Sequence, residues 1–147
     1  MPADRDEVCI LHEVALEHVG AYAGHGPWDN DLHHIEQVYL LNGGEFLVGI
    51  YEGRVVAMGA FKKTDAERAE IKRMRVHPDF QDRGFGQLIL LALEARARAM
   101  DYAVLHLDTS TVQVAAQKLY RKHGFRETGE TKVSRGSTDI LFEKRIR

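Results

Sequence analysis

The sequence predicts a single α/β domain, and three observations lead to that prediction. The chain has 147 residues, 44% hydrophobic and 29% charged, which is typical of one ordinary globular domain. No repeat or linker-like stretch divides residues 1–147. From residue 70 onward, strand-like and helix-like segments alternate. This order implies at least one parallel pair of strands joined by a helix.

Charge balance and apolar patterning exclude several classes of partner. Twenty basic and 22 acidic residues give a net charge of −2, without the basic character of a nucleic-acid-binding domain. No stretch approaches the ~20 apolar residues of a membrane-spanning helix, and the first six residues do not resemble a signal peptide. The single cysteine, Cys9, has no internal disulfide partner, which favours a reducing compartment. We therefore expect a cytoplasmic protein with no nucleic-acid or membrane partner, and the composition leaves open a monomer or a homodimer.

Periodicity and turn residues predict six strands flanked by about four helices. The predicted elements are helices over residues 7–22 and 32–41, strands over 45–51, 54–62 and 70–76, a helix over 86–100, a strand over 103–108, a helix over 112–123, and strands over 125–130 and 138–144.

Spacing defines the elements of the first half. Over residues 7–22, apolar side chains recur at intervals of three and four, the period of an amphipathic helix. Asp29 and Asp31 offer N-cap side chains for the helix that follows. Two strand-like segments then meet at a tight turn over 52–53, and Pro78 stops the third strand.

Composition and glycine define the elements of the second half. Residues 86–100 are dense in leucine and alanine, which are strong helix formers. Residues 103–108 form a short apolar run typical of a buried strand. Helical spacing over residues 112–123 predicts a helix that ends at Gly124. The last two segments have the pattern of closing strands.

The loop over residues 81–87 carries the strongest functional signal. Its sequence is Gln81-Asp82-Arg83-Gly84-Phe85-Gly86-Gln87. Two glycines one residue apart let backbone N–H groups turn inward as an anion nest, and the helix that begins there adds unpaired donors. Arg83 could add a fork of donors to a phosphate oxygen. The alternative is a plain strand-to-helix turn.

Other chemistries lack their residues. A dinucleotide fingerprint needs a third glycine where Ile89 stands, and a Walker loop needs lysine where Gln87 stands. The eight histidines show no metal-ligand spacing, and no serine lies in a Gly-x-Ser-x-Gly elbow. We therefore expect no metal and no hydrolase nucleophile.

Two motifs together resemble one family. The run from Val76 to Gly86 resembles motif A of the GNAT N-acetyltransferases, whose core is Gln/Arg-x-x-Gly-x-Gly/Ala. Further along, the run from Gln113 to Phe125 resembles that family's Asn-x-x-Ala-x-x-Leu-Tyr-x-x-x-Gly-Phe. Two motifs in this order are more specific than either alone. The resemblance implies a mixed, mostly antiparallel central sheet with a parallel crossover.

The resemblance also implies a co-substrate, acetyl-coenzyme A (acetyl-CoA). In that family the loop holds the pyrophosphate, and the preceding strand pairs with the pantetheine arm. The positions that match are Met74, Arg75, Val76, Gln81, Asp82, Arg83, Gly84, Phe85, Gly86, Gln87 and Gln113. Gln113 stands where the family usually has asparagine, so it keeps the amide and adds a methylene. Lys118, Arg121 and Lys122 are most simply a solvated helix face, with the cofactor's phosphates as an alternative partner.

Tyr120 resembles the family residue that donates to the departing sulfur. Tyr120 follows Gln113 by seven residues, about two helical turns, which places the two side chains within about 20° of each other. The neighbouring apolar stripe that is expected to pack on the sheet consists of Val112, Ala115, Ala116 and Leu119. A thiol pKa of ~8.5 and a tyrosine pKa of ~10 favour a strengthening hydrogen bond over full proton transfer. A packing residue with a satisfied hydroxyl is the alternative.

Glu70 is the expected base. Ala69-Glu70-Ile71 resembles the start of the same strand in the histone-acetylating branch, where that glutamate acts through water. Alternation predicts that Glu70 shares a face with Lys72, Met74 and Val76. A surface carboxylate paired with Lys72 is the alternative. An α-amino acceptor, with a pKa of ~7.7–8.0, hardly needs such a base, whereas a lysine at ~10.4 does.

The acceptor pocket is expected, by analogy with the family, at the first two helices. The candidates are Tyr22, Trp28, Asp29 and Asp31, because aromatic rings and a carboxylate suit a cationic amine, although the two aspartates are equally explained as helix caps. The resemblance thus implies transfer of acetyl from acetyl-CoA, and we expect the acceptor to be the primary amine of a small molecule that attacks directly in a ternary complex. A protein N-terminal or lysine acetyltransferase, with a peptide amine as acceptor, and a non-catalytic acyl-CoA sensor are the alternatives.

Overall fold

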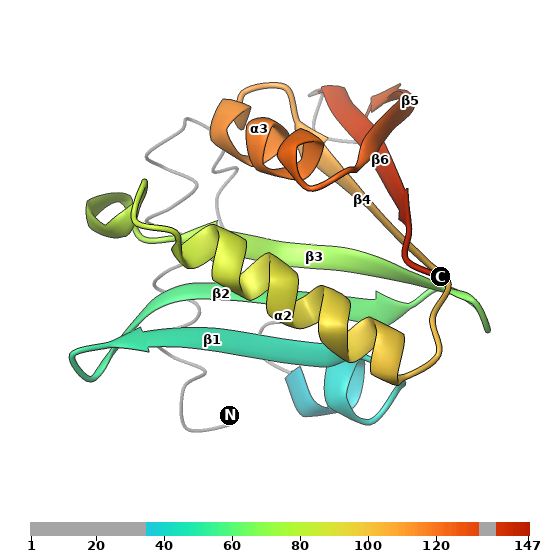
Figure 1. Cartoon of the computed structure of the whole chain (residues 1–147), viewed down its shortest axis with the longest axis horizontal. Coiled ribbons are helices and arrows are strands. Elements are labelled where there is room, and N and C mark those ends of the chain that lie inside the picture. Colours follow the sequence, from blue (N-terminus) through green and yellow to red (C-terminus); the bar gives the residue numbers. More distant parts are fainter. Residues whose placement is uncertain (1–34, 133–137) are drawn as a thin grey trace.

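The computed structural model describes residues 35–132 and 138–147, without the side chains of Glu36 and Lys132. In this part of the chain, six strands form one sheet in the order β1-β2-β3-β4-β6-β5. The β3–β4 pair is parallel, and every other neighbouring pair is antiparallel. The predicted mixed, mostly antiparallel sheet is confirmed, and helix α2 makes the parallel crossover (Figure 1).

The elements begin and end close to their predicted positions. In chain order they are η3 (Glu36–Leu40), β1 (Glu45–Tyr51), β2 (Arg54–Lys63), β3 (Arg68–Val76), η4 (Pro78–Phe80), α2 (Phe85–Ala99), β4 (Val104–Ser110), α3 (Val114–Lys122), β5 (Arg126–Lys132) and β6 (Thr138–Arg145). The six strands and the last two helices lie within two residues of their predicted bounds. Of the helix predicted over 32–41, residues 35–40 are helical, with a π-helical turn at η3. The helix predicted over 7–22 lies outside the described residues.

The larger apolar core lies on the face of the sheet that α2 covers. Figure 1 shows α2 running across β1, β2 and β3. Phe61 and Leu105 are buried in this core, and α3 contributes Tyr120 to it. The opposite face has a smaller apolar cluster near η3, which includes Tyr39 and Met58. In the described part of the chain, no helix has the length and apolarity needed to cross a membrane.

The parallel pair is short, and its shortness lets two strands separate. β3 and β4 are paired only between residues 68–70 and 104–106. β3 continues to Val76 and β4 to Ser110 without further pairing between them. Figure 1 shows the two strands separating toward the end where α2 begins and α3 lies. We refer to residues 71–76 and 107–110 as the divergent segment.

A β-bulge in β3 accompanies this divergence. The pairing with β2 slips at Gly59, which lies opposite two residues of β3, Arg73 and Met74. Arg73 has a φ of 61°, a left-handed conformation that non-glycine residues rarely adopt. A bulge of this kind bends the strand and changes the direction of the side chains beyond it.

The bulge overturns the predicted alternation along β3. Met74 and Val76 pack against the core under α2, together with Ile71. Glu70 lies on the other face, beside His106 of β4 in the parallel register. The prediction that Glu70 shares a face with Met74 and Val76 is therefore wrong, because the inserted residue inverts the alternation.

Gly59 is required because α2 and the bulge pack directly on it. A Cβ at this position would lie 2.5 Å from Met74 Sδ, 2.6 Å from Ile89 Cγ2 and 3.1 Å from Leu93 Cδ1. These distances are too short for any side chain larger than hydrogen, so glycine sets how closely α2 approaches β2.

We predict that Gly59→Ala lowers the free energy of unfolding by about 1–3 kcal/mol, because the added methyl overpacks this contact. Gly129→Ala on β5 is the matched control, since a Cβ there would meet nothing within 4 Å. The control should stay within about 0.5 kcal/mol of the parent. Urea unfolding followed by circular dichroism measures both, and equal stability of the two variants would contradict the described packing of α2.

Candidate active site

One edge of β3 carries backbone groups that have no strand partner among the described residues. His77 N donates to Val56 O of β2 at 2.8 Å, so alternate residues of β3 turn their backbone groups toward β2. Met74 and Val76 therefore direct theirs to the opposite edge, where pairing with β4 has already stopped. This edge belongs to the stretch that the sequence predicted to pair with a cofactor arm.

Two long side chains hold the carbonyl oxygens of this edge. Arg75 Nη1 donates to Met74 O at 2.7 Å, and Gln81 Nε2 donates to Val76 O at 3.4 Å. Amide groups of an extended ligand could replace these donors, as an added strand would. The edge therefore has the chemistry to pair with an amide-bearing arm.

The loop gives α2 an N-terminus with no side-chain cap. Gly84 is the N-cap residue, with a φ of 85°, and the first turn contains no acidic residue. Asp82 also has a positive φ, 61°, so two left-handed residues turn the backbone as the predicted nest requires. The first N–H groups of α2 and the positive end of its dipole suit a phosphate.

Two cationic side chains lie near the start of α2. The guanidinium carbon of Arg83 lies 5.2 Å from the ring centroids of both Tyr51 and Phe80. Lys122 of α3 instead donates to Gln87 Oε1 at 3.1 Å. Lys122 is exposed, as expected for a solvated helix face, and this contact places its charge beside the first turn of α2.

Gly86 lies where α2, β3 and α3 approach one another. A Cβ at this position would lie 3.5 Å from both Val76 Cγ2 and Leu119 Cδ2. Phe85 packs beside the core, with its ring centroid 6.1 Å from that of Phe80. The residues present therefore fit a phosphate at the N-terminus of α2 and an extended arm along the edge of β3.

Tyr120 extends from α3 into the core and is only 4% exposed. Its ring packs on those of Phe125 and Phe142, with centroids 5.7 and 6.0 Å away. Burial raises the pKa of the Tyr120 hydroxyl; the positive charge of Arg75 on β3 opposes this rise and the negative charge of Asp108 on β4 adds to it. The charges that act on the hydroxyl come from both separating strands, and the hydroxyl stays a protonated donor at neutral pH.

The buried face of α3 differs from the predicted stripe. Val112 lies before the start of α3 and is exposed, and Ala115 is exposed within it, whereas the other two members of the stripe pack against the core. Gln117 is buried instead. Its amide donates to the carbonyl oxygens of Ser110 and Thr111, each at 3.1 Å, which makes the burial of a polar side chain acceptable.

Gln113 closes the turn between β4 and α3. Its Oε1 accepts hydrogen bonds from Thr109 Oγ1 at 3.1 Å and from Ser110 N and Oγ at 3.3 Å. With this oxygen engaged, Gln113 has its amide N–H groups to offer a cofactor arm. Its contact with the cofactor stays a prediction.

Glu70 is the last residue of β3 that pairs with β4, and its partner there is His106. Among the described residues, no ion pair joins Glu70 to Lys72, the partner of the alternative role. His106 was not among the residues expected from the sequence. The signal was available in the alternation of polar and apolar residues over 104–110, which is unusual for a central strand.

The predicted acceptor residues Tyr22, Trp28, Asp29 and Asp31 lie outside the described residues. Within residues 35–132 and 138–147, no group of three or more histidine, cysteine, aspartate or glutamate side chains is placed to hold a metal ion. We refer to the edge of β3 at residues 74–76 and the loop over 81–87 that begins α2 as the cradle. The described part of the site therefore consists of the cradle, Tyr120 and the sheet face around Glu70.

The fold and motifs have a counterpart among known proteins. Residues 11–125 match the acetyltransferase (GNAT) family, and the chain belongs to that family. N-acetylaspartate synthetase from Xenopus tropicalis is 30% identical over 118 residues, which cover 78% of this chain and 44% of that protein. The chain spans about a third to just over a half of the length of the curated relatives it matches.

Solved structures share the fold. A GNAT family acetyltransferase from Staphylococcus aureus Mu50 has a TM-score of 0.90 and 18% identity, over 99% of this chain and 94% of that chain. A GNAT family acetyltransferase from Elizabethkingia anophelis with acetyl-CoA bound has a TM-score of 0.67 and 24% identity, over 84% of this chain and 94% of that chain. The resemblance seen in the two motifs is thus confirmed.

We predict that Tyr120 stays protonated at an alkaline pH at which an exposed tyrosine ionises, because burial raises the pKa of its hydroxyl. In an alkaline titration followed by phenolate absorbance, Tyr120→Phe should give the same amplitude as the parent with its five tyrosines. Tyr51→Phe, which removes an exposed tyrosine, is the matched control and should lower the amplitude. Circular dichroism confirms that each protein stays folded. An equal loss in both variants would show that Tyr120 is accessible to water.

Proposed function

We propose that this chain transfers the acetyl group of acetyl-CoA to the primary amine of a small molecule by direct attack in a ternary complex. One observation carries the proposal. Three features meet at the divergent segment: the edge of β3 without a strand partner among the described residues, the N-terminus of α2 without a side-chain cap, and the Tyr120 hydroxyl. Charges on both separating strands, at Arg75 and Asp108, act on that hydroxyl. Family membership supports the class of reaction, and the neighbour with acetyl-CoA bound supports the co-substrate.

The chain's main contribution would be alignment. Holding two reactants in the right geometry can supply roughly 7–11 kcal/mol of the barrier. The N-terminus of α2 and Lys122 would fix the phosphates, and Met74 and Val76 would fix the arm by backbone hydrogen bonds. The thioester would then lie along β3 near the point where β3 and β4 separate.

The chemical step needs a donor and an acceptor of protons. The amine nitrogen forms a bond to the carbonyl carbon, the carbon–sulfur bond breaks, and its electron pair leaves on sulfur. Tyr120 would donate a hydrogen bond to that sulfur. Because burial raises the pKa of its hydroxyl well above that of a thiol, the proton stays on oxygen, and the thiolate takes its proton from solvent. An N–H group of the β3 edge would stabilise the carbonyl oxygen, and Glu70 would assist removal of the amine proton.

A small-molecule acceptor is favoured over a protein acceptor by one finding. N-acetylaspartate synthetase from Xenopus tropicalis, whose match covers 78% of this chain, is named for an acetylated amino acid. We extend the class of acceptor, a small primary amine, to this chain and not the particular amino acid. A cytoplasmic location and a cofactor set without metal are part of the same proposal.

The first test is calorimetric titration with acetyl-CoA. We expect micromolar binding to the parent and at least tenfold weaker binding to Gly84→Asp than to Gly84→Asn. The two variants have the same shape and both tolerate positive φ and the N-cap position, so their difference reports the added charge beside the phosphate. No binding to the folded parent, or equal binding by the two variants, would contradict the cradle.

The second arm measures thiol release with a panel of amino acids, alkylamines and short peptides as acceptors. We expect release with small amines and a loss of kcat in Tyr120→Phe without loss of acetyl-CoA affinity. Full activity of Tyr120→Phe would remove its proposed role. Release with peptides alone would identify a protein acetyltransferase, and binding without any release would favour the sensor.

A further inference from the structure

A row of charged side chains crosses the sheet at the base of the divergent segment. Glu70 of β3 lies beside His106 of β4 in the parallel register, and His106 lies opposite Glu143 of β6. In the strand register, Lys62 of β2 lies opposite Glu70, and Arg126 of β5 lies opposite Glu143. Residues paired in this way share a face of the sheet, so one imidazole lies between two carboxylates on the face away from α2.

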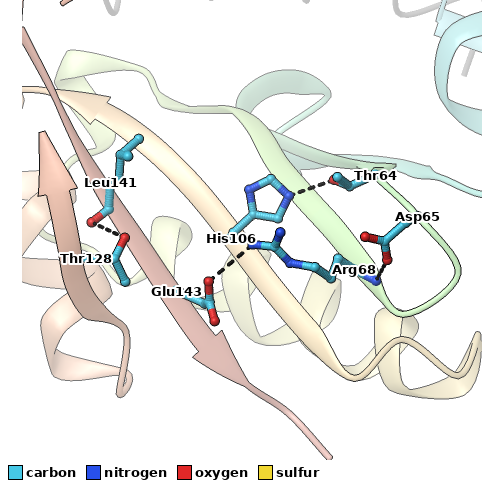
Figure 2. A network of polar contacts seen from close by, with 7 residues as sticks. All are labelled: Thr64, Asp65, Arg68, His106, Thr128, Leu141 and Glu143. Carbon is cyan, nitrogen blue, oxygen red and sulfur yellow. Dashed lines mark hydrogen bonds and ion pairs between the residues drawn. The ribbon is translucent and has the colours of Figure 1, made fainter. Parts of the chain in front are cut away.

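The two carboxylates beside His106 differ in their partners. Arg68 Nη2 lies 3.2 Å from Glu143 Oε2, so a guanidinium neutralises that carboxylate. No such pair joins Glu70 to another described residue. Figure 2 shows the Arg68–Glu143 pair beside the His106 ring. Glu70 is therefore the carboxylate whose charge is available to His106.

Thr64 holds the imidazole from the other side. Thr64 Oγ1 lies 2.6 Å from His106 Nε2. Thr64 itself is fixed in the turn between β2 and β3, where its N–H donates to Arg68 O at 2.9 Å and Asp65 Oδ1 accepts from Arg68 N at 2.9 Å. Figure 2 shows one ring nitrogen directed at Thr64 and the other on the opposite side of the ring.

We propose that His106 is the proton acceptor of the acetyl transfer, with Thr64 as a positioning residue and Glu70 as the counter-charge. This inference rests on the proposed function. When Nε2–H donates to Thr64 Oγ1, Nδ1 carries a free electron pair. The amine proton passes to Nδ1, directly or through water, as the carbon–nitrogen bond forms, and the imidazolium then lies beside the carboxylate of Glu70.

The surroundings of His106 keep it neutral before the reaction. Burial lowers the pKa of the imidazole below its ordinary value, and Arg68 acts in the same direction, against the carboxylates of Glu70, Glu143 and Asp108. A neutral imidazole can accept a proton across the physiological range. His106 would therefore perform the base chemistry that the sequence analysis gave to Glu70, and Glu70 would act through it.

The position of His106 in the sheet also suits a proton acceptor. Glu70 and His106 form the last pair before β3 and β4 separate, so both lie where the free edge of β3 begins. Tyr120 belongs to the core on the α2 side, and His106 lies on the other face. The hydrogen-bond donor and the proton acceptor thus lie on opposite faces of the sheet, so that one would serve the departing sulfur and the other the attacking amine.

The kinetic test uses the acceptor with the fastest thiol release in the amine panel. We expect His106→Gln to lower kcat/KM about 10²-fold while the affinity for acetyl-CoA stays within twofold. Only the neutral amine attacks, so below the pKa of the amine a plot of log kcat/KM against pH rises with a slope of one. The parent should steepen to a slope of two at a pH below the ordinary imidazole pKa of ~6.5, because burial lowers the pKa of His106, and His106→Gln should not steepen. An unchanged slope with activity within threefold of the parent would overturn the proposal.

The positioning residues have a matched pair of variants. Thr64→Val should lower kcat/KM about tenfold and Thr64→Ser should retain activity, because serine keeps the hydroxyl. Glu70→Gln should lower kcat/KM more than Glu143→Gln, whose carboxylate is already paired. Equal activity of the valine and serine variants would remove the role of Thr64.

A readout without turnover separates this inference from the proposed function. Long-range ¹H–¹⁵N NMR at pH 8 should show His106 with its proton on Nε2 in the parent and in Thr64→Ser. A proton on Nδ1 would overturn the proposal even if the enzyme is active. A parent that neither binds acetyl-CoA nor releases thiol would refute the proposed function, and this inference with it.

Discussion

The structure depends on how briefly β3 and β4 pair. Three residues of each strand are in register, and both strands then continue without each other. The bulge at Arg73 bends β3 at this place, and Gly59 lets α2 follow the bend closely. Without the divergence, the backbone groups of Met74 and Val76 would form hydrogen bonds with β4. With it, they become an edge that an extended ligand can complete.

The two faces of the sheet supply different environments for the two ends of the proposed reaction. The α2 face is apolar, and it keeps the hydroxyl of Tyr120 protonated. The other face carries the row through Glu70, His106 and Glu143, where a proton can be held among paired charges. The inverted alternation after the bulge separates these environments. It keeps Met74 and Val76 in the core while Glu70 remains on the charged face.

Most of the fold could be predicted because its signals are local. Alternation, glycine turns and helix formers placed each described strand within two residues. The bulge could not be predicted, because Arg73 is not a residue that signals positive φ. The position of Arg83 over two aromatic rings, and of Lys122 beside Gln87, depends on tertiary contacts. The alternation over 104–110 could have placed His106 on a polar face, but its partners come from three other segments of the chain and could not be predicted.

The most direct measurement is amide hydrogen exchange with and without acetyl-CoA. Our account predicts that acetyl-CoA slows exchange at the N–H groups of Met74 and Val76 and at those of Phe85, Gly86 and Gln87, with no change along β5 (Arg126–Lys132). Protection confined to these amides would show that the ligand completes the free edge of β3 and covers the N-terminus of α2. Binding that leaves these amides unprotected would contradict the claim that the divergence of β3 and β4 forms the site.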